Sequence, residues 1–130
     1  MPSLLHQTVA YRLPDPTQLN CLVKNTYYEA RGEPVEGKIA VAQVVLNRVD
    51  RAGYPKTICS VVYQPKQFSW TLDHHKAKIV WSEWQKSLDA SVRAYNLPRI
   101  NATHYHNLSV DPKWGLQPVK TIKNHIFYTS

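Results

Sequence analysis

The run IAVAQVVL, residues 39–46, constrains the fold of this chain more than any other stretch. It lies inside a segment with helix signals, because Pro34 suits a first turn and Gly53 is the expected C-terminal stop. A helix that is apolar on nearly every side must be packed on several sides. The sequence therefore predicts a domain built around a central helix within residues 34–53.

Two polar residues interrupt this central helix on one face. Gln43 and Asn47 lie four residues apart, so their side chains point the same way. Buried there, they need hydrogen-bond partners. We expect a structural network from them in preference to substrate contact.

A preceding helix is predicted over residues 15–31, DPTQLNCLVKNTYYEAR. Asp15 or Thr17 can cap it, and Pro16 suits its first turn. At about 100° per residue, its less polar residues fall on one side. That expected buried stripe is Leu19, Leu22, Val23, Thr26 and Ala30. Glu29 falls at the edge of the stripe, so we expect its side chain to be half shielded from water.

The remaining segments predict shorter elements. Residues 57–63, TICSVVY, suit a short helix or a strand. A polar stretch over roughly 76–95 is helix-compatible, and its expected buried face is Trp81, Trp84, Leu88 and Val92. Residues 102–106 and 122–128 alternate like strands and could pair as a small antiparallel sheet. The predicted fold is a mainly helical α+β single domain over residues 1–130, with 1–16 as a less regular arm.

The two cysteines, Cys21 and Cys59, have no metal-binding spacing. Cys21 lies in a helical pattern and Cys59 in an apolar run, which favours buried thiols. A disulfide between them stays open.

The charge balance favours anionic partners. Sixteen Lys and Arg against nine Asp and Glu give a net charge of +7. Such a surplus attracts nucleic acid, an anionic membrane face or an acidic wall polymer. Basic residues interleaved with Tyr and Trp suit single-stranded nucleic acid, but they form no recognisable binding signature, so we expect no nucleic-acid partner.

The N-terminal residues lack the basic start and sustained apolar stretch of a secretion signal. No run approaches the roughly 18 apolar residues of a membrane span. We therefore expect synthesis in the cytosol and, for any export, a route without a signal peptide.

Glu29 is the strongest candidate for chemistry. A carboxyl group at the edge of an apolar stripe is desolvated, which raises its pKa. A general acid that cleaves a glycosidic bond must hold its proton near neutral pH, as such a group does. Arg31 would oppose this shift by favouring the anion. A glutamate at a helix end is usually a solvated surface group, so this signal alone does not identify an enzyme.

Two histidines raise the question of a metal. His104 and His106 would share a strand face, and His74, His75 or His125 could complete a site. No HExxH motif and no cysteine pair accompany them. We therefore expect no metal and no cofactor, and roles in stacking or hydrogen bonding instead.

Four blocks of the sequence carry a resemblance in the same order: YYEARGEPVEGKIAVAQVVLNRV, YPKTICSVVYQPKQFS, ATHYHN and IKNHIFY. Over roughly residues 19–128 the chain resembles the SleB/CwlJ-type cell-wall hydrolases. The resemblance implies a fold like that of lysozyme and lytic transglycosylases, acting on the glycan strands of peptidoglycan. It also implies that Glu29, the glutamate of the EARGE block, is the catalytic acid.

The resemblance further implies a groove around Glu29. Gln67, Phe68 and Ser69 match the family's second block and would line the groove opposite Glu29. Trp70 follows them as a candidate substrate contact, but this bulky aromatic residue is a feature of this chain and is not implied by the family. The remaining wall would be Tyr105, His106, His125 and Tyr128.

The implied reaction uses one glutamate. Glu29 would protonate the β-1,4 bond between N-acetylmuramic acid and N-acetylglucosamine, and the muramic 6-hydroxyl would then attack to give an anhydro sugar. Asp73 is a possible second carboxylate, and a requirement for it would indicate hydrolysis by a muramidase or glucosaminidase instead. Glu33 is expected to be structural in its turn, and Glu36 a first-turn helix charge.

The small size and positive charge look like those of a phage endolysin, made in the cytosol and acting on the wall after the membrane is permeabilised. A virion-associated enzyme is the alternative. The expected partners are glycan strands and an acidic wall or outer-membrane surface, and the expected state is a monomer. A non-catalytic glycan-binding or nucleic-acid-binding basic module is the competing class.

Overall fold

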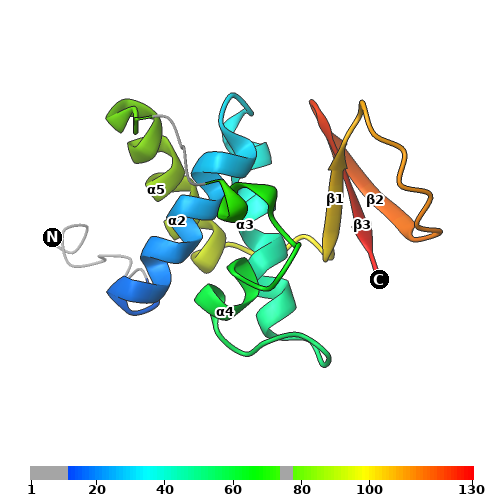
Figure 1. Cartoon of the computed structure of the whole chain (residues 1–130), viewed down its shortest axis with the longest axis horizontal. Helices are drawn as coiled ribbons and strands as arrows, with labels where there is room; N and C mark the ends of the chain where they lie inside the picture. Colours follow the sequence, from blue (N-terminus) through cyan, green and yellow to red (C-terminus); the bar gives the residue numbers. More distant parts are fainter. Residues whose placement is uncertain (1–11, 74–77) are drawn as a thin grey trace, which may run out of the picture.

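The computed structural model describes residues 12–73 and 78–130 (Figure 1). Its elements are α2 (Pro16–Ala30), α3 (Val35–Val49), α4 (Ile58–Val62), η1 (Ser69–Leu72), α5 (Trp81–Asn96), β1 (His104–Asn107), β2 (Gln117–Ile122) and β3 (His125–Thr129). The predicted mainly helical α+β fold with a C-terminal antiparallel element is confirmed. In this part of the chain, no helix has the length and apolar character needed to cross a membrane.

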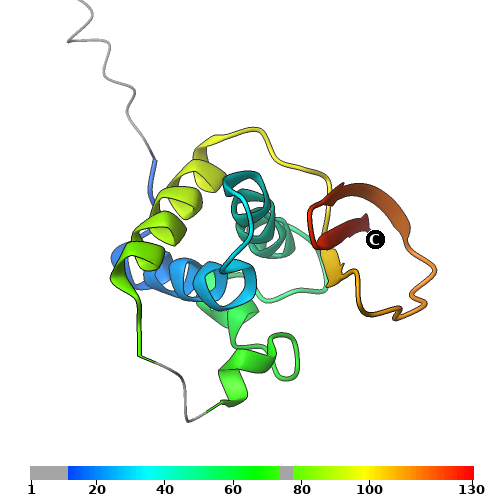
Figure 2. The same cartoon turned by 90° about the horizontal axis from the view of Figure 1, so that it is seen from above.

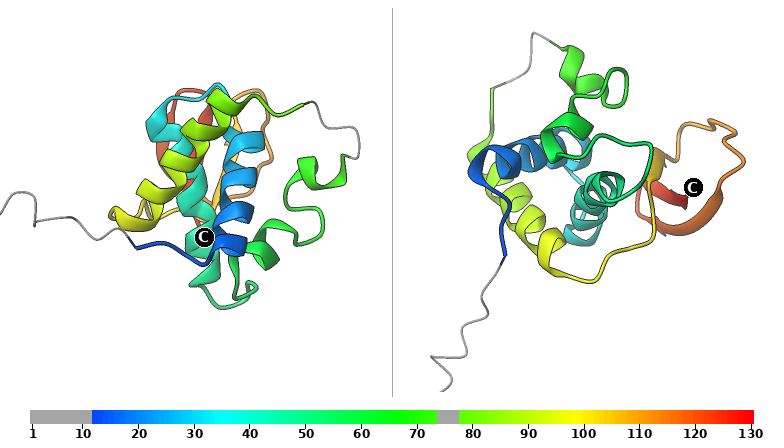
Figure 3. Two further views of the ribbon diagram at one scale, coloured as in Figure 1. Left: turned by 90° about the vertical axis from the view of Figure 1, so that its left-hand side faces the viewer. Right: turned by 90° about the horizontal axis from the view of Figure 1, so that it is seen from below.

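The helix α3 is central, as its sequence predicts. Seen from above, it lies between the pair α2 and α5 and the sheet (Figure 2), and residues 40–48 are all buried. Figure 3 shows α2, α3 and α5 side by side. Gly53 was expected to end this helix, but that prediction was wrong, because α3 ends at Val49. Tight bonds such as Arg51 N to the Arg48 carbonyl (3.1 Å) close its last turn, and Gly53 serves the following turn at a φ of 90°.

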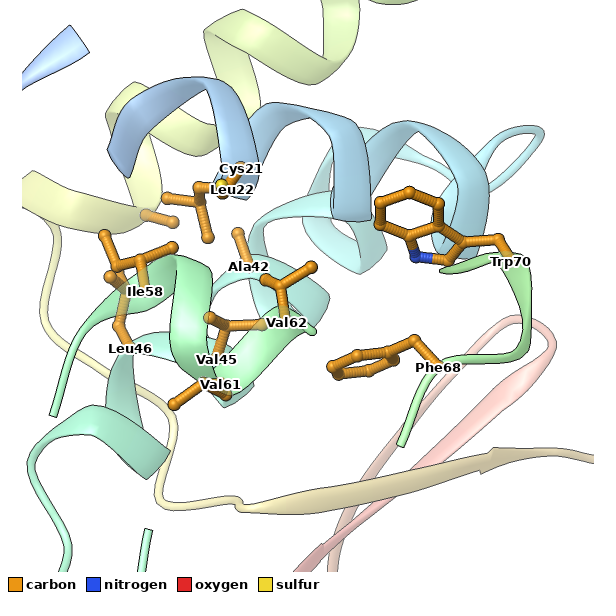
Figure 4. Packing of buried hydrophobic residues seen from close by; sticks show 11 residues of the cluster. Cys21, Leu22, Ala42, Val45, Leu46, Ile58, Val61, Val62, Phe68 and Trp70 are labelled. Carbon is orange, nitrogen blue, oxygen red and sulfur yellow. The ribbon is translucent and has the colours of Figure 1, made fainter. Parts of the chain in front are cut away.

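Two apolar clusters flank α3. The first, shown in Figure 4, joins α2, α3 and α4 to Phe68 and Trp70 of the following segment. The second lies between the helices and the sheet, and its buried members are Ala30, Ala40, Val41, Val44, Ala102, Ile122 and Phe127. We call this second cluster the seam.

The helix α2 begins as predicted. Asp15 caps it by accepting from the backbone N–H groups of Thr17 (3.0 Å) and Gln18 (3.1 Å). Of the predicted stripe, Leu22, Val23, Thr26 and Ala30 are buried, whereas Leu19 is only partly buried. The buried side is also wider than predicted, since it includes Cys21, Asn25 and Tyr27. This follows because α2 contacts α3, α4 and α5.

The helix α5 corrects two expectations. It begins at Trp81, and residues 74–77, which the prediction partly included, lie outside the described residues. Its buried residues are Ser87, Ala90, Ser91 and Ala94, whereas Trp81 is 66% exposed. Small side chains allow close approach to α2 and α3, which a search for large apolar residues does not anticipate.

Cys21 and Cys59 form a disulfide, so the expectation of free thiols was wrong. The segment 57–63 resolves as the helix α4, capped by Thr57. The backbone N–H of Cys59 donates to Gln18 Oε1 (2.9 Å), which fixes α4 against α2. This packing brings the two Cα atoms to 5.2 Å.

The predicted pairing of the last two strand segments is confirmed. β1 pairs antiparallel with β3, in a sheet of order β1-β3-β2. The strand β2 was not predicted as a separate strand, because five of its six residues are exposed and Pro118 interrupts its pattern. A turn at Lys123 and Asn124 joins it to β3.

Gln43 and Asn47 form the predicted structural network. The Gln43 amide donates to the Ala94 (3.2 Å) and Pro98 (3.1 Å) carbonyls, and Asn47 Nδ2 donates to the Ala102 carbonyl (2.8 Å). The network ties α3 to the connection between α5 and β1. It therefore sets where β1 begins.

Candidate active site

Glu29 lies in the last turn of α2 and opens onto a pocket of about 330 Å³. The pocket is lined by Glu29, Arg48, Lys66, Gln67, Phe68, His104, Tyr105 and Trp114. These residues come from α2, α3, the segment before η1, β1 and the connection between β1 and β2. The pocket therefore exists only when the sheet is docked against the helices.

The carboxyl group of Glu29 is half-buried, as predicted. Burial raises its pKa, whereas the hydrogen bond from Tyr105 and the charge of Arg48 lower it, and the net shift is upward. The opposing cation is Arg48 and not Arg31, which donates to the Tyr27 hydroxyl instead (2.9 Å). Glu29 thus has the property that a general acid needs near neutral pH.

Tyr105 donates its hydroxyl hydrogen to Glu29 Oε1. Burial, followed by the charge of Glu29, raises the tyrosine pKa well above its usual value, so this hydroxyl keeps its proton. Its ring packs edge-on against His125 (5.1 Å between centroids) and against Phe127 of the seam (5.5 Å). The sheet therefore holds the donor that orients the acid.

Arg48 is a buried cation, only 5% exposed. Its Nε donates to the Thr103 carbonyl (2.8 Å) and its Nη1 to Gln67 Oε1 (3.1 Å). The guanidinium also lies 5.5 Å from the centre of the Phe68 ring. Burial lowers its pKa, but an arginine in a protein stays charged. Arg48 thus joins α3, the residue just before β1 and the segment before η1.

Three of the predicted site residues line the pocket together with Glu29: Gln67, Phe68 and Tyr105. Ser69 is exposed at the start of η1 and is not among the described lining residues. Trp70 lies in the first apolar cluster instead, where its Nε1 donates to Asn25 Oδ1 (2.7 Å) and its ring stacks on Tyr28 (4.9 Å).

The other predicted residues lie behind or beside the pocket. His106 stacks on Tyr128 (5.2 Å), and His125 is buried behind Tyr105. Asp73 is exposed just after η1, and its charge contributes to the raised pKa of Tyr28, after burial and Tyr27. Neither histidine nor Asp73 is among the described lining residues. The role of Asp73 as a second carboxylate stays a prediction.

Three lining residues were missed by sequence reasoning: Arg48, Lys66 and Trp114. Arg48 could have been found, because it directly follows Asn47 in a helix that the sequence predicts to be packed on several sides. An arginine buried there needs hydrogen-bond or charge partners, which makes it a candidate site residue. The segment around Trp114 has no periodic pattern, so nothing local marks this tryptophan. His104, considered as a metal ligand and expected instead to stack or form hydrogen bonds, also lines the pocket and packs edge-on against Trp114 (5.3 Å).

Within residues 12–73 and 78–130, no group of three or more His, Cys, Asp or Glu is arranged to hold a metal ion. His104 and His106 come from the same strand, β1. His74 and His75, which were considered with them, lie outside the described residues.

The chain is similar in sequence to known cell wall enzymes. Residues 32–128 match the protein family described as Cell Wall Hydrolase, a match that begins just after Glu29. The spore cortex-lytic enzyme of Oceanobacillus iheyensis is 35% identical over 115 residues, which are 84% of this chain and 40% of that protein. The Bacillus subtilis spore cortex-lytic enzyme is 32% identical, over 84% of this chain and 36% of its own length. The chain thus spans about 40% or less of these two relatives.

Two solved structures share the fold. The catalytic domain of the germination-specific lytic transglycosylase SleB from Bacillus anthracis aligns with a TM-score of 0.75 and 27% identity, covering 90% of this chain and 100% of that domain. The catalytic domain of the Bacillus cereus SleB protein aligns with a TM-score of 0.72 and 29% identity, covering 90% and 95%. These catalytic domains and this chain therefore have the same fold.

Proposed function

This chain belongs to the cell wall hydrolase family, and on that premise we propose that it cleaves the glycan strands of peptidoglycan with Glu29 as the catalytic acid. The observation that most supports this proposal is the half-buried carboxyl group of Glu29, which has a raised pKa and opens onto a pocket. The shared fold with a domain described as a lytic transglycosylase supports the same reaction class.

The proposed reaction begins with protonated Glu29. Its proton passes to the oxygen that bridges C1 of N-acetylmuramic acid and the neighbouring N-acetylglucosamine, and the C1–O bond breaks. An oxocarbenium-like centre develops at C1. Glu29, now a carboxylate, takes the proton of the muramic 6-hydroxyl as that oxygen attacks C1. The products are an anhydro sugar and a free 4-hydroxyl, and the acid is regenerated.

A single acid favours this route over hydrolysis. Most glycosidases use two carboxyl groups, whereas Glu29 is the only acid among the described residues that line the pocket. A hydrolytic muramidase or glucosaminidase of the same fold is the alternative. Mass spectrometry of the digest separates them, because the anhydro product lacks the elements of one water molecule.

The decisive test is Glu29→Gln, which removes the transferable proton and keeps the shape. We expect the loss of turbidity of purified peptidoglycan to slow about 10²–10⁴-fold. The pKa of Glu29 is higher in the folded protein than in the unfolded chain. At a pH above the unfolded-state pKa, the tendency of Glu29 to ionise therefore destabilises the folded protein. Glu29→Gln removes this group, so the variant should melt no lower than the wild type at neutral pH. Glu36→Gln, on the exposed start of α3, is the matched control. Undiminished lysis by Glu29→Gln would support a glycan-binding module instead.

We further propose that the protein is an endolysin that acts as a monomer. It would be made in the host cytoplasm and reach the wall after the inner membrane is permeabilised. The net charge of +7 supports attraction to acidic wall or outer-membrane surfaces. The disulfide supports action in an oxidising compartment. Cells that express it should lyse only with a membrane-permeabilising agent, and lysis without one would contradict the proposal.

A further inference from the structure

The charges that line the Glu29 pocket are unbalanced. Arg48 and Lys66 are cations, and the only carboxyl group among the described lining residues is Glu29. Burial raises the pKa of Glu29 and lowers that of His104, so the acid tends to hold its proton and the histidine to lack one. The pocket is therefore positive when Glu29 is ready to donate its proton.

The charge of Arg48 has no anionic neighbour in direct contact. Its recorded hydrogen-bond acceptors are a carbonyl and an amide oxygen, and no salt bridge to it occurs within the part of the chain that the structure describes. Buried cations usually pair with anions. An anionic ligand at this point would supply the missing partner.

Lys66 occupies an unfavourable backbone conformation on the rim of the same pocket. The Gln67 N–H donates to the Gln64 carbonyl (3.2 Å), which closes a four-residue turn. Pro65 takes the second position and Lys66 the third, with a φ of 63°. Glycine or asparagine normally takes that third position, because a Cβ atom there is disfavoured. This turn places the exposed Lys66 side chain beside the pocket, where it can reach a ligand.

We propose that Lys66 and Arg48 bind a carboxylate of the substrate next to the glycan bond that is cleaved. This rests on the proposed function, since it assigns the ligand of the same pocket. Two groups in peptidoglycan carry this chemistry. One is the lactyl carboxylate of muramic acid, free only when an amidase has already removed the peptide stem. The other is a carboxylate of an attached stem.

Titration calorimetry on the Glu29→Gln variant, in which turnover should be strongly slowed, tests the proposal. The probes are N-acetylmuramic acid, its lactyl amide and N-acetylmuramoyl-L-Ala-D-Glu. We expect a carboxylate probe to bind about fivefold more tightly than the amide, with the difference shrinking as salt rises. Preference for the free acid identifies the lactyl group, and preference for the dipeptide identifies the stem. Equal binding of all three probes overturns the proposal.

The charge is then removed at Lys66. Lys66→Gln in the same background should abolish the preference for the carboxylate probe, and Lys66→Arg should keep it. Lys123→Gln is the matched control. Lys123 is also exposed and also has a left-handed backbone conformation, with a φ of 47°, but it lies in the turn between β2 and β3 and is not among the described residues that line the pocket. A preference that survives Lys66→Gln contradicts the assignment. The proposed function fails separately, if the wild-type protein releases no muropeptides from the wall.

Discussion

Two carboxyl groups only four residues apart, Glu29 and Glu33, both accept hydrogen bonds from the C-terminal part of the chain, but in different ways. Glu29 accepts one hydrogen bond, from Tyr105, and opens onto the pocket. The Glu33 side chain is 7% exposed, and both of its oxygens accept from Asn124, at 3.3 Å from the backbone N–H and 2.8 Å from Nδ2. One carboxyl group therefore faces a pocket, and the other is held at both oxygens.

The difference shows how one motif can supply both a reactive and a structural acid. A carboxyl group with both oxygens hydrogen-bonded is fixed in position and holds two segments together. A half-buried carboxyl group with one donor is desolvated and tends to keep its proton. Glu33 thus anchors the turn before α3 to the turn between β2 and β3, and this anchor helps to keep the sheet that carries Tyr105 in place. The sequence predicted a structural role for Glu33 but not its partner.

The largest expected effect comes from breaking the seam itself. Phe127 is fully buried, and its ring contacts both Tyr105 (5.5 Å), which donates to Glu29, and His125 (6.2 Å), which lies beside Glu33. Phe127→Ala should lower the free energy of unfolding by about 3–5 kcal/mol. Urea denaturation measures it, with Val119→Ala, 42% exposed on β2, as the control. A loss under about 1 kcal/mol would show that the sheet is not held by this cluster.

A smaller effect should separate the two acids. Glu33→Gln keeps the shape but weakens the bonds from Asn124, and we expect it to cost about 1.5 kcal/mol of unfolding free energy. Activity per folded molecule should stay within a few-fold of the wild type. Glu36→Gln is the control, because its ion pair with Lys120 (2.6 Å) is solvent-exposed and should contribute under about 1 kcal/mol. If Glu33→Gln abolished cleavage by a fully folded protein, the two acids would not differ as described.

The smallest effect should appear only in the pH dependence. The bond from Tyr105 lowers the pKa of Glu29, so Tyr105→Phe should raise that pKa further. The acid then keeps its proton to higher pH, and the alkaline limb of the cleavage rate moves upward in pH. Rates measured against pH for both proteins check this. Tyr128→Phe, whose hydroxyl lies 2.8 Å from His106 Nε2 outside the pocket lining, should leave the limb unmoved. A downward shift in Tyr105→Phe would contradict the electrostatic account.

Several features of the site were predictable because their signals are local. Asp15 and Pro16 mark the start of α2 within one turn, and the apolar run at residues 39–46 identifies the central helix. The raised pKa of Glu29 followed from its place at the edge of an apolar stripe. Hydrophobic periodicity and capping act over a few residues, so a single segment carries them.

Partners across the chain were decided only by tertiary structure. The sequence determined that residue 29 is a shielded acid at a helix end, but not that Tyr105, 76 residues later, donates to it. Likewise, packing of α4 on α2 joined Cys21 to Cys59, and close approach of α5 selected its small residues as the buried face. Such contacts depend on which surfaces meet when the helices and the sheet dock. That docking is a property of the whole chain, and no local pattern of residues encodes it.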